Sequence, residues 1–284
     1  MQLQDPAQDK LPTQVYFKRD YLSLVVFIGV LLVSLFGIPI FMYLYDFSWL
    51  DWTLFGLLYM VTGLGITVGY HRFISHRSFT SPAIVKVALL VAVGWAMENS
   101  ALKWCSDHVR HHAKVDQEED PYNAKKGFWH SHLLWIFSKS PYASEKYLAP
   151  FRKDRWIMWQ HKYYLPIVVS GFVLPAMIGF LHRGWVGFAS GLLLAGVFRV
   201  FVVLNSTFCI NSICHLWGAQ PYGDHNSSRD SWWVSLVTFG EGYHNYHHAN
   251  PRDYRNGPAW YNFDPSKWLI YSLSLIGLAK TSPD

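Results

Sequence analysis

Charged residues are scarce in this sequence, and their scarcity argues against a soluble globular protein. Only 15% of the 284 residues are charged, whereas about 25% is usual in soluble proteins. The formal net charge of +5 is not concentrated in a basic run, and no nucleic-acid-binding motif is present, so we expect no nucleic-acid partner. With 51% hydrophobic residues, the chain is expected to lie in a membrane and to contact lipid.

Cysteine is also rare, and the start of the chain has no apolar core. Cys105, Cys209 and Cys214 form neither a CxxC pair nor another metal-binding spacing. Their odd number suits a reducing compartment rather than a framework of disulfides. The first 20 residues lack the apolar core of a cleavable signal peptide, so no such peptide is expected.

Long uncharged runs predict four transmembrane helices arranged as two hairpins. Residues 21–45 and 52–70 are uncharged, and only a short turn separates them. Residues 163–181 are also uncharged, and 185–210 contain Arg199 as their single charge. About 20 apolar residues suffice to cross a bilayer. Arg199 lies about 21 Å along its helix, near enough to the far interface to snorkel or to find a polar partner.

The basic residues predict which side of the membrane each segment occupies. Of the 24 Lys and Arg residues, 14 lie in the segment 71–162 between the hairpins. By the positive-inside rule this segment and both termini are cytosolic, and the membrane is the inner one if the protein is bacterial. We therefore expect an all-α integral membrane protein with a single domain over 1–284. Its stem comprises 21–70 and 163–210, and its cytosolic helical cap comprises 71–162 and 211–284.

Two shorter apolar runs do not fit the transmembrane pattern. Residues 87–97 and 268–278 contain 11 residues each. This length is too short to cross the bilayer, so we expect helices that are buried or lie at the membrane interface.

Histidine is abundant, with 14 residues, and eight of these form three clusters. The clusters lie in HRFISH, DHVRHH and HNYHH, which fall in or beside expected cytosolic segments. In HxxHH, positions i, i+3 and i+4 share one face of a helix, so three imidazoles project together. Eight histidines are too many for one mononuclear site, so two metal ions are predicted, and imidazole suits zinc, copper, iron and nickel. The clustered residues are His71, His76, His108, His111, His112, His244, His247 and His248.

Two other pairs extend this prediction. His71 and His76 differ by about 140° around an α-helix, so we expect each to serve one of two neighbouring ions. Asn211 and His215, in NSICH, are i and i+4 on the helix where the last uncharged run emerges, and they project from one face. With three clusters nearby, we interpret His215 as a ninth ligand and Asn211 as a polar partner.

The three clusters resemble the histidine boxes of the membrane fatty acid desaturases in order, spacing and placement. Their surroundings, GYHRFISHRSF, KWCSDHVRHH, NSICHLWG and GEGYHNYHH, are similar to those of the stearoyl-CoA type, which comprises acyl-CoA and acyl-lipid delta-9 desaturases. The resemblance extends over residues 21–258. It implies a four-helix stem, a cytosolic cap and a di-iron centre. It also implies an enzyme that uses O2 to insert a cis double bond into a saturated acyl chain.

The resemblance divides the ligands between two Fe2+ ions. One ion would be held by His71, His108, His112 and His247. The other would be held by His76, His111, His215, His244 and His248, with Asn211 joining through a water molecule. Glu241 is expected to orient a ligand imidazole, as carboxylates beside metal sites commonly do, although Asp107, Asp224 and Asp230 compete for this role.

The resemblance also implies contacts to the acyl chain and to its carrier. Ser106 stands where the best-known acyl-CoA enzymes have an arginine, so coenzyme A, phospholipid and acyl carrier protein all remain open as carriers. Thr207 and Phe208 are expected to line the acyl tunnel, and the two lysines to contact phosphate. The expected substrate contacts are Asp107, Lys125, Lys126, Thr207 and Phe208.

Three functions remain open from the sequence. The desaturase is favoured, and since only a short segment follows Pro258, electrons are expected from a separate donor. An acidic ferredoxin, or a b-type cytochrome with its reductase, would suit the basic cytosolic face. A membrane hydroxylase or monooxygenase could use the same histidine scaffold. A metal transporter is disfavoured, because it would need ligands near the bilayer midplane.

Overall fold

Helices make up most of the structure, a computed structural model that describes residues 18–139 and 145–281. The expectation that the first 20 residues contain no cleavable signal peptide concerns residues that lie largely outside these ranges. The α-helices are α1 (Tyr21–Leu32), α2 (Ile38–Leu44), α3 (Trp49–Leu64), α4 (Ala83–Gly94), α5 (Ala101–Lys114), α6 (Phe128–His132), α7 (Glu145–Arg152), α8 (Arg155–Lys162), α9 (Tyr164–Ser190), α10 (Arg199–Leu216), α11 (Trp232–Val237), α12 (His244–Ala249) and α13 (Pro265–Leu275).

The remaining regular segments are short. The π-helical segments are η1 (Val33–Gly37), η2 (Gly65–Ser75) and η5 (Gly191–Phe198), and the 3₁₀ turns are η3 (Ala124–Lys126) and η4 (Leu134–Phe137). The strands are β1 (Lys18–Arg19), β2 (Phe79–Thr80), β3 (Ser138–Lys139) and β4 (Lys280–Thr281). β1 pairs with β3 and β2 with β4, both antiparallel. The predicted predominance of helix is therefore confirmed.

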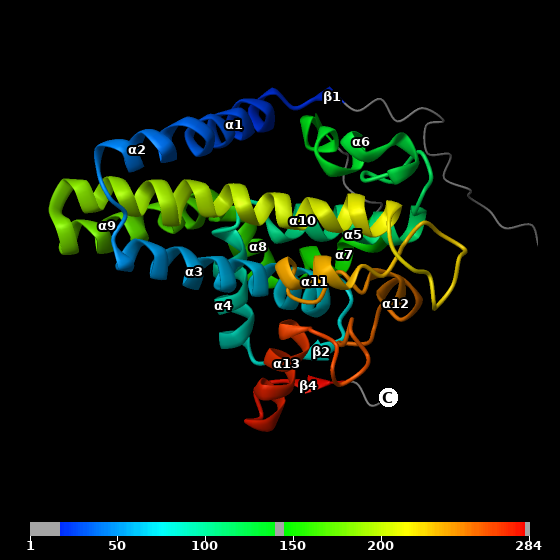
Figure 1. Cartoon of the computed structure of the whole chain (residues 1–284). Coiled ribbons are helices and arrows are strands. Elements are labelled where there is room, and N and C mark those ends of the chain that lie inside the picture. Colours follow the sequence, from blue (N-terminus) through cyan, green and yellow to red (C-terminus); the bar gives the residue numbers. More distant parts are fainter. Residues whose placement is uncertain (1–17, 140–144, 282–284) are drawn as a thin grey trace, which may run out of the picture.

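Three helical stretches among the described residues are long and apolar enough to cross a membrane. They are Tyr21–Leu44 (α1, η1 and α2), Trp49–Ser75 (α3 and η2) and Tyr164–Leu216 (α9, η5 and α10). The most apolar windows of the three are 17%, 44% and 50% buried, so the first stretch exposes the largest share of its side chains. In Figure 1 the long helices extend together toward one side of the molecule, and the short helices gather at the other.

The third stretch doubles back on itself at Arg183 and Gly184, where the backbone leaves helical geometry. Gly184 has φ of +60°, a left-handed conformation that glycine adopts without a clashing Cβ atom. Beyond this turn, Gly187 packs directly on Gly179, and a Cβ atom on either would lie 2.0 Å from the carbonyl oxygen of the other. Tyr164–Leu216 therefore comprises two antiparallel helices in close contact.

Arg199 is fully buried and finds polar partners on the backbone. Its Nε donates to the Ala195 carbonyl oxygen at 2.8 Å, and its guanidinium also donates to the carbonyl oxygens of Trp95 at 2.8 Å and Gly171 at 3.4 Å. An unpaired cation at this depth would be costly, and the three carbonyl groups satisfy it. Of the two predicted outcomes, the polar partner is the one observed.

The two short apolar runs form helices close to their predicted positions. In α4, Leu90 and Val93 are fully buried, and the helix packs against η2 and α8. In α13, Ile270 is buried, whereas Trp268 and Tyr271 are about half exposed at 46% and 55%. Helix α4 therefore has a buried face, and α13 presents aromatic side chains outward.

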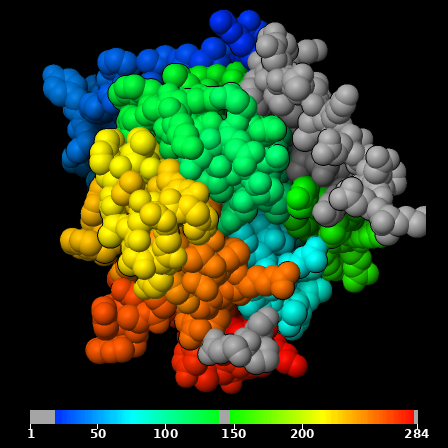
Figure 2. All heavy atoms as spheres, turned by 90° about the vertical axis from the view of Figure 1, so that its right-hand side faces the viewer, coloured from blue at the N-terminus to red at the C-terminus, as the bar shows by residue number. Residues whose placement is uncertain are grey.

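The short helices at the other side come from distant parts of the chain. Figure 2 looks onto this side and shows segments from the middle of the chain (cyan to green) beside segments from its last third (yellow to orange). Beneath them one core packs η2, α4, α5 and α13 together, with Val68, Leu90, Cys105 and Ile270 fully buried. This core fixes the positions of the helices that carry the clustered histidines.

Candidate metal centre and adjoining cavity

Nine histidines collect into two neighbouring groups. The first group is His71, His76, His108, His112 and His247, and the second group is His111, His215, His244 and His248. Within each group, one ring nitrogen of every residue lies within 4.8 Å of the corresponding nitrogens of the others. The groups touch, since the ring centroids of His112 and His248 are 4.3 Å apart. The nine are the histidines that the sequence singled out.

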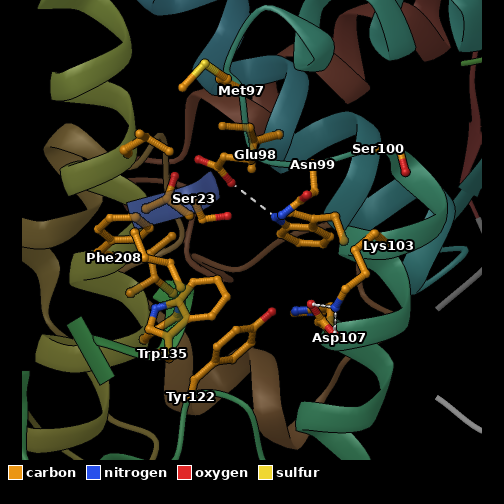
Figure 3. A pocket seen from close by; sticks show the side chains of 18 of the residues that line it. Ser23, Met97, Glu98, Asn99, Ser100, Lys103, Asp107, Tyr122, Trp135 and Phe208 are labelled. Atoms are coloured by element: carbon orange, nitrogen blue, oxygen red, sulfur yellow. Dashed lines mark hydrogen bonds and ion pairs between the residues drawn. The ribbon is translucent and has the colours of Figure 1, made fainter. Parts of the chain in front are cut away.

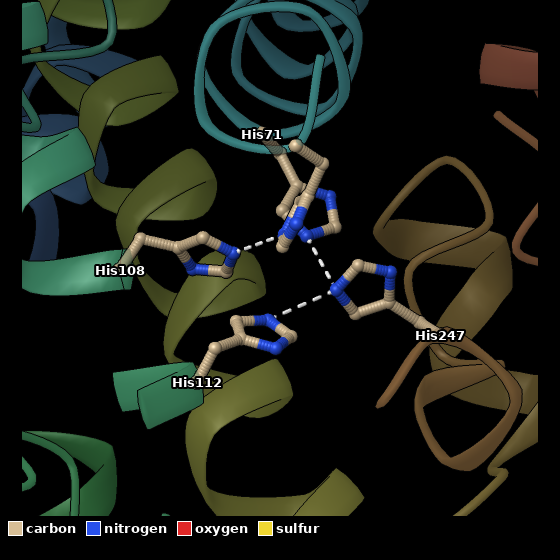
Figure 4. A group of neighbouring side chains, drawn as sticks. His71, His108, His112 and His247 are labelled. Atoms are coloured by element: carbon tan, nitrogen blue, oxygen red, sulfur yellow. Dashed lines mark hydrogen bonds between the residues drawn. The ribbon is translucent and has the colours of Figure 1, made fainter. Parts of the chain in front are cut away.

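The first group is assembled from η2, α5 and α12. The Nε2 atom of His247 lies 3.0 Å from the Nε2 atoms of both His71 and His112. The Nε2 atoms of His76 and His108 are 2.7 Å apart. In Figure 4 the rings of His71, His108, His112 and His247 turn their nitrogens toward one another. Side chains from three elements thus converge on one small volume.

His76 lies with this first group, whereas the resemblance assigns it to the other ion. The prediction assumed an α-helix, in which residues five apart diverge. The segment is instead the π-helix η2, whose hydrogen bonds join residues i and i+5. The His76 amide donates to the His71 carbonyl oxygen at 3.1 Å, and the two ring centroids are 4.7 Å apart. One π-helical turn therefore places both imidazoles on the same side.

The second group is assembled from α5, α10 and α12. His244 lies at its centre, with its Nε2 atom 3.1 Å from the Nε2 atoms of both His215 and His248. The His111 ring lies 5.1 Å from the His215 ring and 5.2 Å from the His248 ring, measured between centroids. Because α5 and α12 each supply histidines to both groups, these two helices join the groups into one unit.

Glu241 holds the outer nitrogen of a first-group histidine, as predicted. Its Oε2 lies 2.8 Å from His71 Nδ1, and its Oε1 accepts a hydrogen bond from the Arg72 guanidinium at 2.9 Å. Arg72 is 1% exposed and is also paired with Asp264. Burial acts to raise the pKa of Glu241, but His71 and Arg72 outweigh it, so the pKa lies below its ordinary value. Asp230, a competitor for this role, instead accepts backbone N–H groups from the first turn of α12.

Two further side chains hold outer nitrogens in the second group, and the sequence did not predict either. Asp120 Oδ1 lies 2.9 Å from His111 Nδ1, and Ser227 Oγ lies 2.8 Å from His215 Nδ1. Ser227 in turn donates to the Asp116 carboxylate at 2.5 Å. Since the outer nitrogen of each ring is held, the inner nitrogen faces the group, which is how ligand imidazoles are oriented in metal proteins.

The nitrogens fit a pair of metal ions. His111 Nε2 is buried and has no hydrogen-bond partner within the described part of the chain. Burial lowers the pKa of His108, His247 and His248 well below the ordinary value, and neighbouring imidazoles lower it further, so the rings are neutral as ligation requires. Nitrogens about 2.1 Å from a shared ion lie about 3 Å apart when their bonds meet at a right angle. The shortest separations, 2.7 to 3.1 Å, agree.

The turn before the third cluster brings its histidines into place. Gly240 has φ of +105°, and a Cβ atom there would lie 2.3 Å from Asp264 Oδ1. A Cβ atom on Gly242 would lie 2.4 Å from the Ser231 carbonyl oxygen. These two glycines therefore let the backbone turn close to the histidines.

A cavity of about 570 Å³ opens on both histidine groups. Four histidines and Asn211 line one part of it, namely His71, His108, His111 and His244 beside that asparagine. Much of the remaining wall is apolar and includes Val26, Phe27, Ile66, Met97, Trp104, Trp135, Leu204 and Phe208. A volume of this size suits a small-molecule ligand, and its apolar wall suits a hydrocarbon.

Only some of the predicted substrate contacts reach this cavity. Thr207 and Phe208, which were expected to line an acyl tunnel, line the cavity. Asp107, another expected substrate contact, lines it as well. Lys125 and Lys126 do not line it, because they lie exposed on η3, and the Lys126 ammonium pairs with Glu118 at 2.8 Å. Any contact they make is therefore to something outside the cavity.

The structure adds wall residues that the sequence did not single out. Lys103 lines the cavity and bonds both carboxylate oxygens of Asp107, at 2.5 and 2.6 Å. Trp104 stacks on His108, with ring centroids 4.9 Å apart and planes 19° apart. Both pairs are i and i+4 on α5, a spacing that could have found them. Glu98 also lines the cavity, and no spacing signalled it.

Comparisons with known proteins find desaturases similar to this chain. A family model described as fatty acid desaturase matches residues 47–271. A probable acyl-CoA desaturase of Schizosaccharomyces pombe is 42% identical over 234 residues, which are 80% of this chain and 48% of that protein. The sn-2 palmitoyl-lipid 9-desaturase of Nostoc sp. is 36% identical over 240 residues, 81% of either chain. The stearoyl-CoA desaturase of Homo sapiens is 34% identical over 252 residues, 87% of this chain and 69% of its own length. The chain spans about half the length of its fungal relatives.

Proposed function

The chain belongs to the fatty acid desaturase family, and on this premise we propose that it inserts a cis double bond, at the delta-9 position, into a saturated acyl chain. The observation that carries the proposal is that both histidine groups open directly on an apolar cavity. A hydrocarbon chain in this cavity would lie against the metal-facing histidines. The delta-9 position agrees with the name of the Nostoc relative.

The proposed architecture is a single desaturase domain over 1–284 with four transmembrane helices. The reversal at Arg183 and Gly184 supports two spans within Tyr164–Leu216, and Arg183 donates to the Asp46 carbonyl oxygen at 2.7 Å, which joins this turn to the other hairpin turn. Both hairpin turns then lie on the side opposite the histidines. The cytosolic cap, the cytosolic termini and an inner-membrane location in a bacterium remain proposals that rest on the positive-inside rule.

The proposed cofactor is a pair of iron ions, one in each histidine group, with Asn211 joining the second through a water molecule. When bound, ferrous ions supply the dioxygen chemistry needed to remove hydrogen from an unactivated methylene. Glu241, Asp120 and Ser227 keep the ligand imidazoles in one tautomer and orientation. The neutral rings and the unpartnered His111 Nε2 support this assignment.

The protein's own contribution to the reaction is to position the chain. Thr207 and Phe208 form part of the wall beside Asn211, and we propose that they hold the reacting carbons against the histidine groups. Asp107, with its Lys103 partner, would contact the more polar part of the substrate. Lys125 and Lys126, exposed on η3, would contact only a carrier that extends beyond the cavity.

We propose an acyl-CoA or an acyl-lipid as the substrate, because relatives bear both kinds of name. Electrons would come from a separate acidic donor, a ferredoxin or a b-type cytochrome with its reductase. His76, His112 and His248 are partly exposed, which supports a centre near the protein surface. Such proximity favours electron transfer from a docked protein.

The test is expression in a host whose fatty acids are profiled by gas chromatography and mass spectrometry. Wild-type protein should add a delta-9 cis double bond, and His111→Ala should not. The matched control is His225→Ala, since His225 is exposed and outside both groups. A hydroxylated chain would instead establish the hydroxylase alternative. An unchanged profile with an iron-loaded protein and a competent donor would overturn both.

A further inference from the structure

Glu98 is a buried carboxyl group in the cavity wall that the proposed reaction does not use. It lies in the link between α4 and α5 and is 7% exposed. Its neighbours Met97 and Asn99 have positive φ angles of 64° and 71°. Such backbone is uncommon for a long side chain such as methionine and is concentrated at functional sites. The fold therefore holds Glu98 in the cavity against a local backbone preference.

The Glu98 carboxyl group contacts two side chains of the cavity wall, Trp104 and Thr207. Oε2 accepts a hydrogen bond from Trp104 Nε1 at 3.1 Å. Oε1 is buried and has no hydrogen-bond partner among the residues that the structure describes. Figure 3 shows the Glu98 carboxyl group at one side of the open space and the rings of Tyr122 and Trp135 at another. The Glu98 carboxyl group therefore lies at the edge of the volume that a ligand would fill.

The surroundings of Glu98 favour its neutral form. The titratable groups that interact with it are the phenols of Tyr70, Tyr122 and Tyr164, which supply no positive charge. Burial raises the pKa of Glu98 to about 7, and contacts with Thr207 and Trp104 offset this only in part. Elsewhere around the cavity, the titratable and charged groups are Asp20, His71, Lys103, Asp107, His108, His111, His161, Glu241 and His244. The lysine among them is bonded to both oxygens of Asp107.

Trp104 connects Glu98 to the metal-facing histidines. Its indole lines the cavity, is held at one edge by Glu98, and stacks on the His108 ring. A change in the charge of Glu98 would thus change its hydrogen bond to Trp104, which lines the cavity. Through Trp104 it would also affect the position of the His108 ring.

We propose that Glu98 is a positioning residue that works as a neutral carboxylic acid: it holds Trp104 in the cavity wall, and its ionisation weakens the binding of an apolar acyl chain. The inference rests on the proposed function, because it takes an acyl chain as the occupant. A bound chain removes water from Glu98, and an unsolvated charge costs far more than a neutral polar group. The acyl chain therefore binds better to the protein with neutral Glu98. By linkage, the factor by which ionisation of Glu98 weakens acyl-chain binding equals the factor by which a bound chain disfavours ionisation.

The first test compares pH profiles of the iron-loaded enzyme with its electron donor. Above pH 7, kcat/KM of the wild type should fall by about tenfold per pH unit, mainly through KM. Glu98→Gln keeps an oxygen for Trp104 but cannot ionise, so its profile should stay flat over this range. Glu119→Gln, a substitution outside the cavity, should retain the wild-type fall. Parallel profiles for wild type and Glu98→Gln would overturn the proposal.

The second test does not depend on activity. Infrared spectra of the wild type should contain the C=O band of a neutral carboxylic acid that disappears as the pH rises through about 7. Subtracting the Glu98→Gln spectrum should isolate that band. Its absence in the wild type at pH 6 would overturn the proposal even if the variant failed to fold. A protein with this band but no desaturation at any pH would instead overturn the proposed function.

Discussion

The two histidine groups lie side by side, yet they are held in different ways. The first group has five imidazoles, and the carboxylate that orients His71 is part of a buried ion-pair network with Arg72 and Asp264. The second group has four imidazoles, and one of its outer partners, Ser227, is a neutral hydroxyl group. The first group is thus tied to the charges of the core, and the second has fewer ligands.

This difference predicts different properties for the two proposed ion sites. A site with four imidazoles keeps more room for another ligand, and Asn211, which lines the cavity, precedes His215 by about one turn on α10. In the first group, by contrast, burial acts to raise the pKa of Glu241, and His71 and Arg72 together keep it below its ordinary value. Substitutions in the first group should therefore cost stability as well as metal affinity, whereas those in the second should cost affinity alone.

The largest effect is expected for His247→Ala. Its Nε2 atom lies 3.0 Å from the Nε2 atoms of both His71 and His112, so its removal opens the first group at its centre. Product formation should fall to background and iron content to about half, measured by mass spectrometry of the host lipids and by elemental analysis. His225→Ala is the control. A His247→Ala protein with the wild-type rate would contradict the account.

The next largest effect is expected for Glu241→Gln. The amide cannot supply the negative charge that His71 and Arg72 require, and it leaves Arg72 paired with Asp264 alone. Iron affinity of the first group should fall about 10- to 100-fold. The melting temperature should fall too, because a buried cation loses a partner. Chelator competition measures the loss of iron affinity, and thermal unfolding measures the fall in melting temperature. An unchanged melting temperature would show that the first group does not depend on the ion pairs of the core.

Asp120→Asn should have a smaller overall effect, confined to the second group. The Asp116 and Tyr122 N–H groups donate to different oxygens of Asp120, so the single amide oxygen can keep only one of these bonds and the local fold should be slightly weakened. The charge beside His111 Nδ1 is lost, and affinity of the second group should fall about tenfold, at the lower end of the same range. Iron should leave the second group before the first during chelation. Equal loss from both groups would show that the two are not separable.

The smallest effect is expected for Ser227→Ala. A neutral hydroxyl group makes a hydrogen bond roughly half as strong as a charged partner does. Without Ser227 the His215 ring should therefore be less well oriented, but it should stay in the second group. Activity should fall by a few-fold, about 1 kcal/mol in binding terms. Steady-state kinetics measure the change. A loss as large as that of Asp120→Asn would mean that Ser227 acts chiefly through Asp116.

The sequence predicted those parts of the site that follow from simple periodicity. His108, His111 and His112 share a face of α5 because i, i+3 and i+4 positions do so in any α-helix. His76 could not be assigned in this way, since the choice between α- and π-helix in η2 depends on how the whole chain packs. Gly69 of η2, for example, lies against Leu89, with no room to spare for a Cβ atom at 3.1 Å.

Residues that act through distant contacts were also missed. Asp120 reaches His111 from a loop nine positions later, and no regular spacing connects the two. Glu98 looked like an ordinary polar residue at the end of an apolar run. Hydropathy predicted the long apolar helices, because uncharged length alone decides them. It could not predict that Lys125 and Lys126 do not line the cavity.

The division of the nine histidines into two groups is the central claim, and anomalous X-ray diffraction at the iron absorption edge tests it most directly. Crystals of the iron-loaded protein should give two peaks for each chain. One peak should lie among His71, His76, His108, His112 and His247, and the other among His111, His215, His244 and His248. A single peak, or a second peak bound to His76, would contradict the account.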